Sequence, residues 1–450
     1  MFQAGGQHEQ EPMLMPSNAW SSMDNQGRGD LYIQDPRSDR CLVQALNSVS
    51  NSIYGASGAA LQDKGTDKTE VQGTVTLTVT KTMTRLTTPL PASKSVQTTQ
   101  PTASFQSPTP TSKKRLKVED FPAEPLWDFE DEYRLEEGSL QTNCPDSVKV
   151  KAAQSPWLRE RFLPNLTLFL DLEHFNLSEW NRLEHFKPPF GFMGLNYTMV
   201  QEILKKFPSV SQQQLLLAAH PQTGTPPCIS CAVVGNGGIL KRSQLGQEID
   251  SHDYVFRVNG ALINGYEQDV GTRTSFYGFT YHSLAASLGL LRNQGFHQMP
   301  MEKDIHYLHF LEGLQDFEWL KYILRDQIME KSVMERPLRY LLMHPDLLRY
   351  VKNRFLRSDI LDTLYWAFYR PSNGAFLLLA AIQLCDRVSA YGFITSDFYQ
   401  FADHYYDPRW KKMHLYTNHD FILEKKLWEQ LHSEGIIQLY HGPKATKPQN

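Results

Sequence analysis

The sequence has no apolar run long enough to cross a membrane. The longest run, Ala375 to Ile382, has eight residues, whereas a membrane-spanning helix needs about twenty. The first residues, Met1 to His8, also lack the basic stretch and the apolar core of a secretory signal peptide. These residues therefore give no sign of a membrane anchor or of an address in the cell.

The sequence also has no excess of charge of one sign. It contains 45 Lys and Arg against 49 Asp and Glu, which leaves a formal net charge of −4. A protein that binds nucleic acid normally presents a clustered basic surface that neutralises phosphates. The composition therefore argues against a nucleic-acid partner.

Cysteine is scarce, and its spacing excludes a zinc site. The five cysteines are Cys41, Cys144, Cys228, Cys231 and Cys385. The Cys228-x-x-Cys231 pair has no second pair and no His-x-x-x-His partner. A redox Cys-x-x-Cys motif normally opens a helix, whereas Cys231 leads into an apolar, strand-like run. Structural disulfides formed in an oxidising compartment are the favoured interpretation.

Residues 1–120 have few apolar residues and are rich in Gln, Ser, Thr, Pro and Gly. Such a segment buries too little apolar surface to offset the loss of chain entropy on folding. We therefore expect a disordered stem over 1–120 and a single folded domain over 121–450. The Ser/Thr/Pro-rich part, 73–112, is also typical of an O-glycosylated stalk.

From Cys231 onward, strand patterns alternate with helix patterns, which predicts an α/β domain with a mostly parallel sheet flanked by helices. The expected strands are Cys231–Gly235, Tyr254–Val258, Thr274–Phe279, Ile305–Phe310, Arg339–Met343, Val388–Ile394 and Ile436–Tyr440. The expected helices are Leu314–Met329, Pro345–Arg357, Gly374–Asp386 and Phe421–Glu434. Ligand sites in such sheets lie outside the carboxyl ends of the strands.

The first expected strand ends in Gly235-Asn236-Gly237-Gly238. Glycines let such a turn approach a ligand closely, and its following amides can point outward to bind an anion. A plain glycine turn without a ligand is an equally good interpretation. The dinucleotide fingerprint is excluded, because Leu240 stands where the third glycine is required.

Further polar residues follow or precede the expected elements. Asn259 ends a strand and offers donors and an acceptor, although Asn259-Gly260 is also a good tight-turn pair. Ser372 and Asn373 precede an apolar helix, whose start carries free amides and a partial positive charge suited to an anion. Since every helix has such a start, a capping role alone is the alternative.

Two late histidines, His404 and His419, could act as acid or base near neutral pH, although a surface role is the commoner one for a loop histidine. Glu424 lies five residues after His419 and does not share its face if both are helical. Its partnership with His419 therefore stays open. We see no tight His/carboxylate cluster in the folded region and expect no metal site.

Three glycosylation triplets begin at Asn165, Asn176 and Asn196. One triplet is a frequent chance match, but three so close together, beside the cysteine pattern, favour a chain that passes through the secretory pathway. We therefore expect a lumenal protein.

Four segments together resemble the sialyl motifs of the eukaryotic sialyltransferase family, in the family's order. Cys231-Ala-Val-Val-Gly-Asn-Gly-Gly through Asp269-Val-Gly-Thr-Arg273 is similar to the large motif, and Arg370-Pro-Ser-Asn-Gly through Cys385-Asp and Tyr391-Gly-Phe to the small one. His404-Tyr-Tyr-Asp407 resembles the third motif and His419-x-x-x-x-Glu424 the very small one. The resemblance implies a Rossmann-like fold of the modified GT-A type.

The resemblance also implies an inverting, metal-independent transfer of N-acetylneuraminate from CMP-sialate, with no cofactor. It assigns donor contacts to Asn236, Asn259, Ser372, Asn373, Gly374 and Gly392. His419 would deprotonate the acceptor hydroxyl, and His404 would stabilise the departing phosphate. It further implies two disulfides, Cys231–Cys385 and Cys144–Cys228, with Cys41 free or intermolecular.

Other segments are similar to the family members that act on O-linked GalNAc: Trp127–Glu130, Asn143–Val148, Asn165–Asp171 and Gly278–Thr280. The implied acceptors are mucin-type glycoproteins, sialylated α-2,6 on GalNAc attached to Ser or Thr. Transfer to galactose, a Rossmann oxidoreductase and a non-catalytic lumenal binding protein are the alternatives. Family members are type II proteins of the Golgi lumen, and their only membrane contact would be an N-terminal anchor that residues 1–20 lack.

Overall fold

The computed structural model describes residues 115–442, except 138–141, 143, 211–212, 214–216, 218–227, 303 and 326–338. The expected stem over 1–120, with Cys41, lies almost entirely outside the described residues, so its predicted disorder stays a prediction. Within the described part, no helix combines the length and the apolar character needed to cross a membrane.

The core of the molecule is a seven-stranded sheet in the order β5-β4-β3-β2-β1-β6-β7. Every neighbouring pair is parallel, which confirms the predicted α/β class. The strands are β1 (Ser230–Val234), β2 (Tyr254–Val258), β3 (Phe276–Phe279), β4 (His306–His309), β5 (Tyr340–Leu342), β6 (Arg387–Tyr391) and β7 (Gln438–Leu439). The chain runs outward from β1 to β5 and then returns to β6 on the other side of β1. The switch in strand order between β1 and β6 is where such sheets bind ligands.

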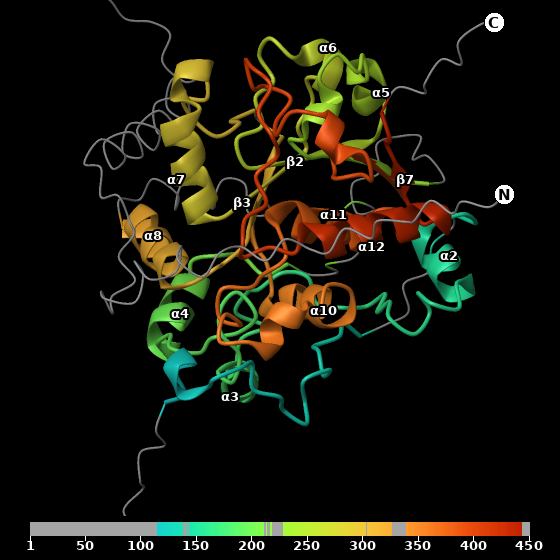
Figure 1. Cartoon of the computed structure of the whole chain (residues 1–450). Helices are drawn as coiled ribbons and strands as arrows, with labels where there is room; N and C mark the ends of the chain where they lie inside the picture. The colour runs from blue at the N-terminus through green and yellow to red at the C-terminus, as the bar shows by residue number, and fades with distance from the viewer. Residues whose placement is uncertain are drawn as a thin grey trace, which may run out of the picture.

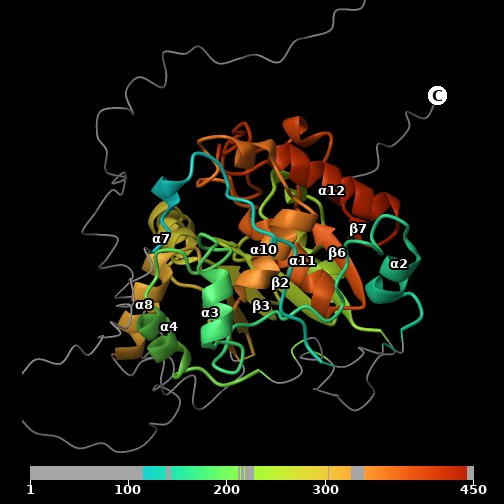
Figure 2. The same cartoon turned by 90° about the horizontal axis from the view of Figure 1, so that it is seen from below.

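Helices flank the sheet (Figure 1), and α11 packs against four of its strands, β1, β2, β3 and β6. The helices are α2 (Val148–Gln154), α3 (Leu177–Leu183), α4 (Tyr197–Leu204), α5 (Gly246–Asp250), α6 (Glu267–Val270), α7 (Tyr281–Leu290), α8 (Leu314–Arg325), α10 (Pro345–Arg354), α11 (Asn373–Leu384) and α12 (Phe421–Ser433). In both views, α4, α7 and α8 lie on one flank and α2 on the opposite one (Figures 1 and 2).

The central helix α11 is apolar around its whole circumference, and every residue from Ala375 to Leu384 is buried. A helix of this kind belongs inside a protein. Ser372 caps its start, because the Ser372 hydroxyl accepts a hydrogen bond from the Ala375 amide. The helix ends at Cys385, which forms a disulfide with Cys231 of β1. The bond therefore ties the end of the central helix to the central strand.

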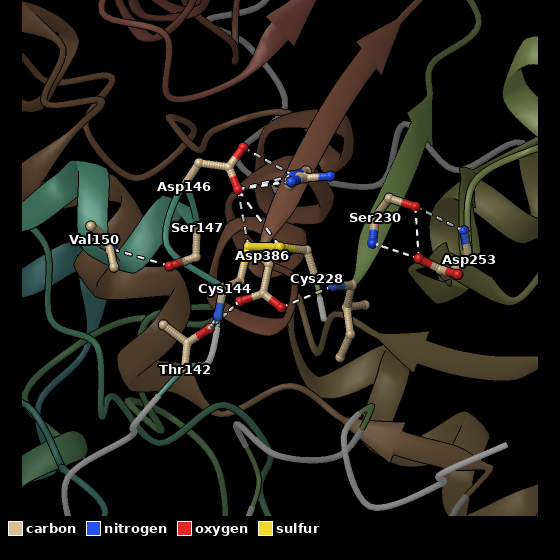
Figure 3. The surroundings of a disulfide bond; sticks show 11 residues. Thr142, Cys144, Asp146, Ser147, Val150, Cys228, Ser230, Asp253 and Asp386 are labelled. Carbon is tan, nitrogen blue, oxygen red and sulfur yellow. Dashed lines mark hydrogen bonds and ion pairs between the residues drawn. A yellow bond between two sulfur atoms is a disulfide. The ribbon is translucent and has the colours of Figure 1, made fainter. Parts of the chain in front are cut away.

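The second expected disulfide, Cys144–Cys228, is also present. The Asp386 carboxylate supports it from both sides (Figure 3), because it accepts hydrogen bonds from the Thr142 hydroxyl at 2.8 Å and from the Ile229 amide at 2.9 Å. Thr142 and Ile229 each lie close in the chain to one of the two bridged cysteines. The start of the folded domain is thus attached to β1.

Candidate active site

Residues from distant motifs meet beyond the carboxyl ends of β1, β2 and β6. Asn236 follows β1, and its Nδ2 donates to the Val258 carbonyl at 3.1 Å. Asn259 follows β2, and its Oδ1 accepts from Nδ2 of Asn373, at the start of α11, at 2.9 Å. The structure therefore brings together Asn236, Asn259 and Asn373, which the sequence could only name separately.

Two amides of the glycine turn after β1 are engaged within the protein, as in the interpretation of a plain glycine turn. The Gly235 amide donates to the Tyr391 carbonyl at 2.7 Å, and the Gly237 amide donates to the Gly392 carbonyl at 3.0 Å. The prediction of an anion-binding turn is therefore wrong for these two amides. They pair with the chain that leaves β6, because β1 and β6 are neighbours in the sheet.

The glycines are required by this backbone contact. A Cβ on Gly235 or Gly237 would lie 2.7 or 2.6 Å from the Gly392 carbonyl oxygen. Gly392 has a φ of +71°, and a Cβ on it would lie 2.7 Å from the Gly235 carbonyl oxygen. In the structure, Gly392 therefore allows the backbone of Gly235 to come close.

Asn236 and Asn259 are held by their neighbours in different ways. The Asn236 backbone carbonyl accepts from the Tyr405 amide, but its side-chain Oδ1 is buried without a hydrogen-bond partner. An unsatisfied buried acceptor costs about 1–3 kcal/mol, which a ligand hydroxyl could recover. Asn259 has a φ of +55°, and its carbonyl accepts from the Tyr277 hydroxyl and the Ala261 amide. Asn259 is thus also a turn residue, as the alternative interpretation had it.

At the start of α11, Ser372 is already engaged by the protein. Its amide and its hydroxyl donate to the Glu424 carboxylate at 2.7 and 2.8 Å. Glu424 is buried, and burial raises its pKa to about 7, against the effect of these hydrogen bonds. Ser372 thus supports the helix start. The amides of Asn373 and Gly374 remain as the groups that could bind a ligand, since the first amides of a helix have no acceptor within the helix.

The space above Gly374 is open. A Cβ there would meet only Ser372 Oγ at 3.5 Å and Phe393 at 3.6 Å, which is ordinary van der Waals contact. No packing within the protein therefore requires glycine at this position, in contrast to Gly235 and Gly392. A ligand close to the helix start would require it.

His419 is held as a neutral base. Its Nδ1 lies 2.8 Å from the Arg370 carbonyl oxygen, which can only accept, so Nδ1 carries the hydrogen and Nε2 has the free lone pair. Burial lowers the pKa of His419 to about 4; the Arg370 guanidinium lowers it further, whereas the hydrogen bond opposes the shift. Glu424, whose partnership with His419 was left open, contacts Ser372 instead. Nε2 of His419 is therefore available to accept a proton at neutral pH.

Glu312 and Arg370 form the support of His419, a role that the sequence analysis missed. The Arg370 amide donates to the Asn418 carbonyl at 3.0 Å, so Arg370 holds the His419 loop at two points. Its Nε lies 2.6 Å from Oε1 of Glu312, which follows β4. Burial raises the pKa of Glu312 to about 7, against the attraction of Arg370. The position of Glu312 just after an expected strand was the sequence signal that could have identified it as a site residue.

His404 lies beside the glycine turn. The backbone at His404 pairs with that at Gly237, and the His404 amide donates to the Asp407 carboxylate at 2.9 Å. Nδ1 of His404 lies 3.7 Å from a carboxylate oxygen of Asp403 and 3.6 Å from one of Asp407. The third motif is thus packed against the large motif.

The expectation of no tight His/carboxylate cluster was wrong for the described residues. Asp403, His404 and Asp407 form one such group, and Glu179, His344 and Asp346 form another. Cations already contact both: Lys411 lies 3.1 Å from Asp403, and Arg182 lies 2.6 Å from Asp346. The second group joins α3 to α10, an association that sequence spacing does not show.

The three glycosylation triplets differ in exposure. Asn176 and Asn196 are exposed and cap α3 and α4 through Oδ1, which leaves Nδ2, the atom that carries a glycan. Asn165 is half-buried, and its Nδ2 donates to the Glu136 carbonyl at 3.1 Å. Thr167 of the same triplet is fully buried.

Comparison with known proteins adds to this geometry. Residues 169–436 match the family model described as glycosyltransferase family 29 (sialyltransferase). Over 376 residues the chain is 60% identical to alpha-N-acetylgalactosaminide alpha-2,6-sialyltransferase 1 from Homo sapiens, which covers 80% of this chain and 62% of that protein. It is 57% identical to the protein of the same name from Mus musculus, covering 80% of this chain and 71% of the other.

More distant similarities extend the comparison. Alpha-N-acetylgalactosaminide alpha-2,6-sialyltransferase 2 from Homo sapiens is 40% identical over 313 residues, which covers 66% of this chain and 82% of that protein. A crystal structure of a mammalian sialyltransferase matches at 23% identity with a TM-score of 0.48, covering 68% of this chain and 100% of the other. The chain thus spans less than two thirds of the length of the 60%-identical relative.

Proposed function

Since the chain belongs to glycosyltransferase family 29, the sialyltransferases, we propose that it transfers N-acetylneuraminate from CMP-N-acetylneuraminate to GalNAc linked to Ser or Thr of glycoproteins. The new bond is α-2,6, made to the 6-hydroxyl of GalNAc, and the anomeric carbon is inverted. The observation that carries the proposal is the orientation of His419, whose Nδ1 donates to the Arg370 carbonyl and whose Nε2 is left basic.

The donor binds at the carboxyl edge of the sheet. Its phosphate lies at the start of α11, where the Asn373 and Gly374 amides and the helix dipole favour an anion. The open space at Gly374 supports this placement, because a Cβ there would occupy it. A ribose hydroxyl satisfies the unpaired Oδ1 of Asn236. Asn259 supports Asn373 through their side-chain hydrogen bond, and Ser372 and Gly392 hold the backbone around the donor.

The acceptor hydroxyl loses its proton to Nε2 of His419 as its oxygen attacks the anomeric carbon. The bond from that carbon to the phosphate of CMP breaks on the opposite face, which inverts the configuration. His404 stabilises the charge that builds on the departing phosphate. The Arg370 carbonyl balances the imidazolium that forms on His419, since it accepts from Nδ1–H throughout.

The reaction needs no metal ion in this proposal. CMP leaves as a monophosphate, which carries less charge than the diphosphate of other sugar nucleotides. The dipole at the start of α11 provides the positive potential instead, and His404 donates a hydrogen bond to the departing phosphate. Asp403 and Asp407 flank His404 and serve its orientation.

The acceptor and the location rest on similarity. The relatives at 60% and 57% identity are both named for alpha-2,6 transfer to N-acetylgalactosaminides, which supports GalNAc over galactose. The two disulfides and the exposed triplets at Asn176 and Asn196 support the Golgi lumen, where the substrates would be mucin-type glycoproteins.

Transfer can be tested with the purified chain, CMP-N-acetylneuraminate and a peptide that carries GalNAc on one Thr, in buffer with EDTA. We expect a product sialylated on the 6-hydroxyl of GalNAc, identified by NMR, at the same rate with and without EDTA. Transfer only to terminal galactose would contradict the acceptor, and loss of activity with EDTA would contradict the metal-free mechanism. Binding of CMP without any transfer would point to a binding protein.

A further inference from the structure

Large apolar side chains are exposed on both sides of His419. Among the residues that the structure describes, six of them lie on the two segments that meet at this histidine, with exposed fractions between 40% and 75%. We call this set the apolar rim: Leu364, Tyr365, Phe368, Leu415, Tyr416 and Ile422. Exposed large apolar side chains on neighbouring segments commonly mark a binding site.

The two segments of the rim are joined at the catalytic base. Arg370, two residues after Phe368, donates its amide to Asn418 and accepts from Nδ1 of His419. On the other side, the Tyr416 carbonyl accepts from the His419 amide, and the two rings lie 6.4 Å apart. The rim is therefore continuous with the base.

The exposed side chains stand on a firmly anchored segment. Trp366 is 2% exposed, and its Nε1 donates to the Phe121 carbonyl at 3.2 Å. Tyr369 is fully buried and donates its hydroxyl to the Leu356 carbonyl. Phe368, between these anchors, is 66% exposed. The anchors at Trp366 and Tyr369 thus fix the backbone on both sides of Phe368 and keep its side chain exposed to solvent.

We propose that the apolar rim binds the polypeptide of the acceptor, as an extended, proline-containing stretch on either side of the glycosylated Ser or Thr. The inference rests on the proposed function. The 6-hydroxyl of GalNAc must reach Nε2 of His419, and only one sugar ring separates that hydroxyl from the peptide. The peptide must therefore pass over the surface that surrounds His419.

The chemistry of the rim matches such a peptide. Segments that carry O-linked GalNAc are rich in Ser, Thr and Pro, and proline favours the extended polyproline II conformation. Grooves lined with aromatic residues bind this conformation at little entropic cost. The rim contributes the rings of Tyr365, Phe368 and Tyr416 for this purpose.

Residues 1–114 of the same chain are the competing occupant. The first described residues run along the rim segment, since the Glu124 amide donates to the Leu361 carbonyl and the Phe121 carbonyl accepts from Trp366. The experiment must therefore separate an external peptide from this segment and from a second copy of the chain.

The test uses the full chain and three acceptors: N-acetyl-GalNAc-threonine methylamide, a GalNAc-Thr nonapeptide with Pro on both sides of Thr, and the same peptide with Ala for Pro. For the wild type we expect kcat/KM to rise in the order single residue, Ala peptide, Pro peptide. Phe368→Ala and Leu415→Ala should raise KM for the Pro peptide about tenfold. The two variants should leave unchanged both kcat/KM for the single-residue acceptor and the inhibition constant of CMP.

Leu290→Ala and Tyr322→Ala are matched controls, because both side chains are exposed on other elements, α7 and α8. Neither should change any of these constants. Equal losses on all three acceptors, or no loss on the Pro peptide, would overturn the proposal. A higher kcat/KM of the rim variants on the Pro peptide would assign the rim to residues 1–114. A wild type that sediments as a dimer and rim variants that sediment as monomers would assign the rim to a second copy of the chain. Either result would overturn the proposal. A wild type that transfers to none of the acceptors would refute the proposed function itself.

Discussion

At the scale of single residues, three hydrogen bonds define the geometry of the candidate site. The bond from His419 to the Arg370 carbonyl selects the tautomer with a basic Nε2. The bonds from Ser372 to Glu424 occupy both donors of the residue that caps α11. Side-chain identity alone assigned neither role, because both depend on a partner far away in the chain.

Replacement of His419 by Ala should lower kcat by about a hundredfold to ten-thousandfold, the usual contribution of a general base. Affinity for CMP should stay within about twofold of wild type, because the role proposed for His419 concerns the acceptor and not the donor. Steady-state kinetics and CMP titration measure the two effects. His297→Ala, at an exposed histidine, should change neither, and near-normal transfer by His419→Ala would exclude His419 as the base.

Glu424 makes stability depend on pH. Burial raises the pKa of Glu424 in the folded state to about 7, above its ordinary value of 4.5. Between these two pH values the folded state therefore keeps a proton that the unfolded state has released. Stability from this group is therefore fully present below pH 4.5 and is lost as pH rises through 7, by about 3 kcal/mol in total. Urea unfolding of wild type and Glu424→Gln at pH 5 and pH 7.5 should show a smaller fall with pH in the variant. An identical fall in both proteins would contradict the assignment.

The glycosylation triplets should be used unequally in a secretory host. Asn176→Gln and Asn196→Gln should each remove the mass of one N-glycan, because both side chains are exposed with Nδ2 free of the helix cap. Asn165→Gln should leave the glycan mass unchanged, because Nδ2 is bonded to Glu136 and Thr167 is buried. Intact-mass spectrometry before and after glycosidase treatment distinguishes the three. A glycan at Asn165 would contradict the packing around Thr167.

At the scale of elements, the site depends on two kinds of glycine. Gly235 and Gly392 are required by backbone packing, whereas Gly374 adjoins open space at the start of α11. The expected strands and the four long helices are all present, and within the described residues their ends are shifted by a few residues. The expected helix end at Met329 lies outside the described residues. The short helices α2 to α7 were not predicted, because four to ten residues carry too few turns for a periodic apolar pattern.

Alanine substitutions should separate these glycines. Gly392→Ala should destabilise the protein by about 3 kcal/mol or more, because its positive φ adds to a backbone overlap. Gly435 has a φ of +69° with no atom near a Cβ, so Gly435→Ala should cost only about 1 kcal/mol. Gly374→Ala should keep or slightly improve stability and raise KM for CMP-sialate about tenfold. Denaturant unfolding and donor kinetics test the series, and unchanged donor KM in Gly374→Ala would place the phosphate elsewhere.

At the scale of the whole molecule, one disulfide ties the end of the central helix α11 to β1, and the other ties the start of the folded domain to the segment that leads into β1. Cys231–Cys385 closes a separation of 154 residues and Cys144–Cys228 one of 84. In the chain-entropy account, loops of these lengths each contribute about 4–5 kcal/mol and differ by less than about 1 kcal/mol. The two disulfides therefore contribute similarly to the stability of the protein and differ in which elements they position.

Double alanine variants should reveal this difference. Both Cys231→Ala/Cys385→Ala and Cys144→Ala/Cys228→Ala should lower the free energy of unfolding by about 2–5 kcal/mol. Only the first should also weaken CMP binding in the fraction that still folds. Its bond ties β1, which Asn236 follows, to α11, which contains Gly374. Unfolding curves and CMP titration at 15 °C measure both. Equal loss of CMP affinity in the two variants would contradict a positioning role.

The sequence by itself determined the class of the fold and the identity of the motif residues. Buried parallel strands appear as short apolar runs, and a buried helix such as α11 appears as a long one, so both are local signals. The names Asn236, Asn259, Ser372 and His419 came from the same local patterns.

Only the tertiary structure decided what these residues contact. The pairing of β1 with β6 directed the amides of Gly235 and Gly237 to carbonyls of Tyr391 and Gly392. The packing of α12 brought Glu424 to Ser372. Arg370 and Glu312 became the support of His419 because β4 and the loop before α11 end at the same edge of the sheet. Hydrogen bonds and burial depend on partners that are distant in the chain, and these partners are adjacent only after folding.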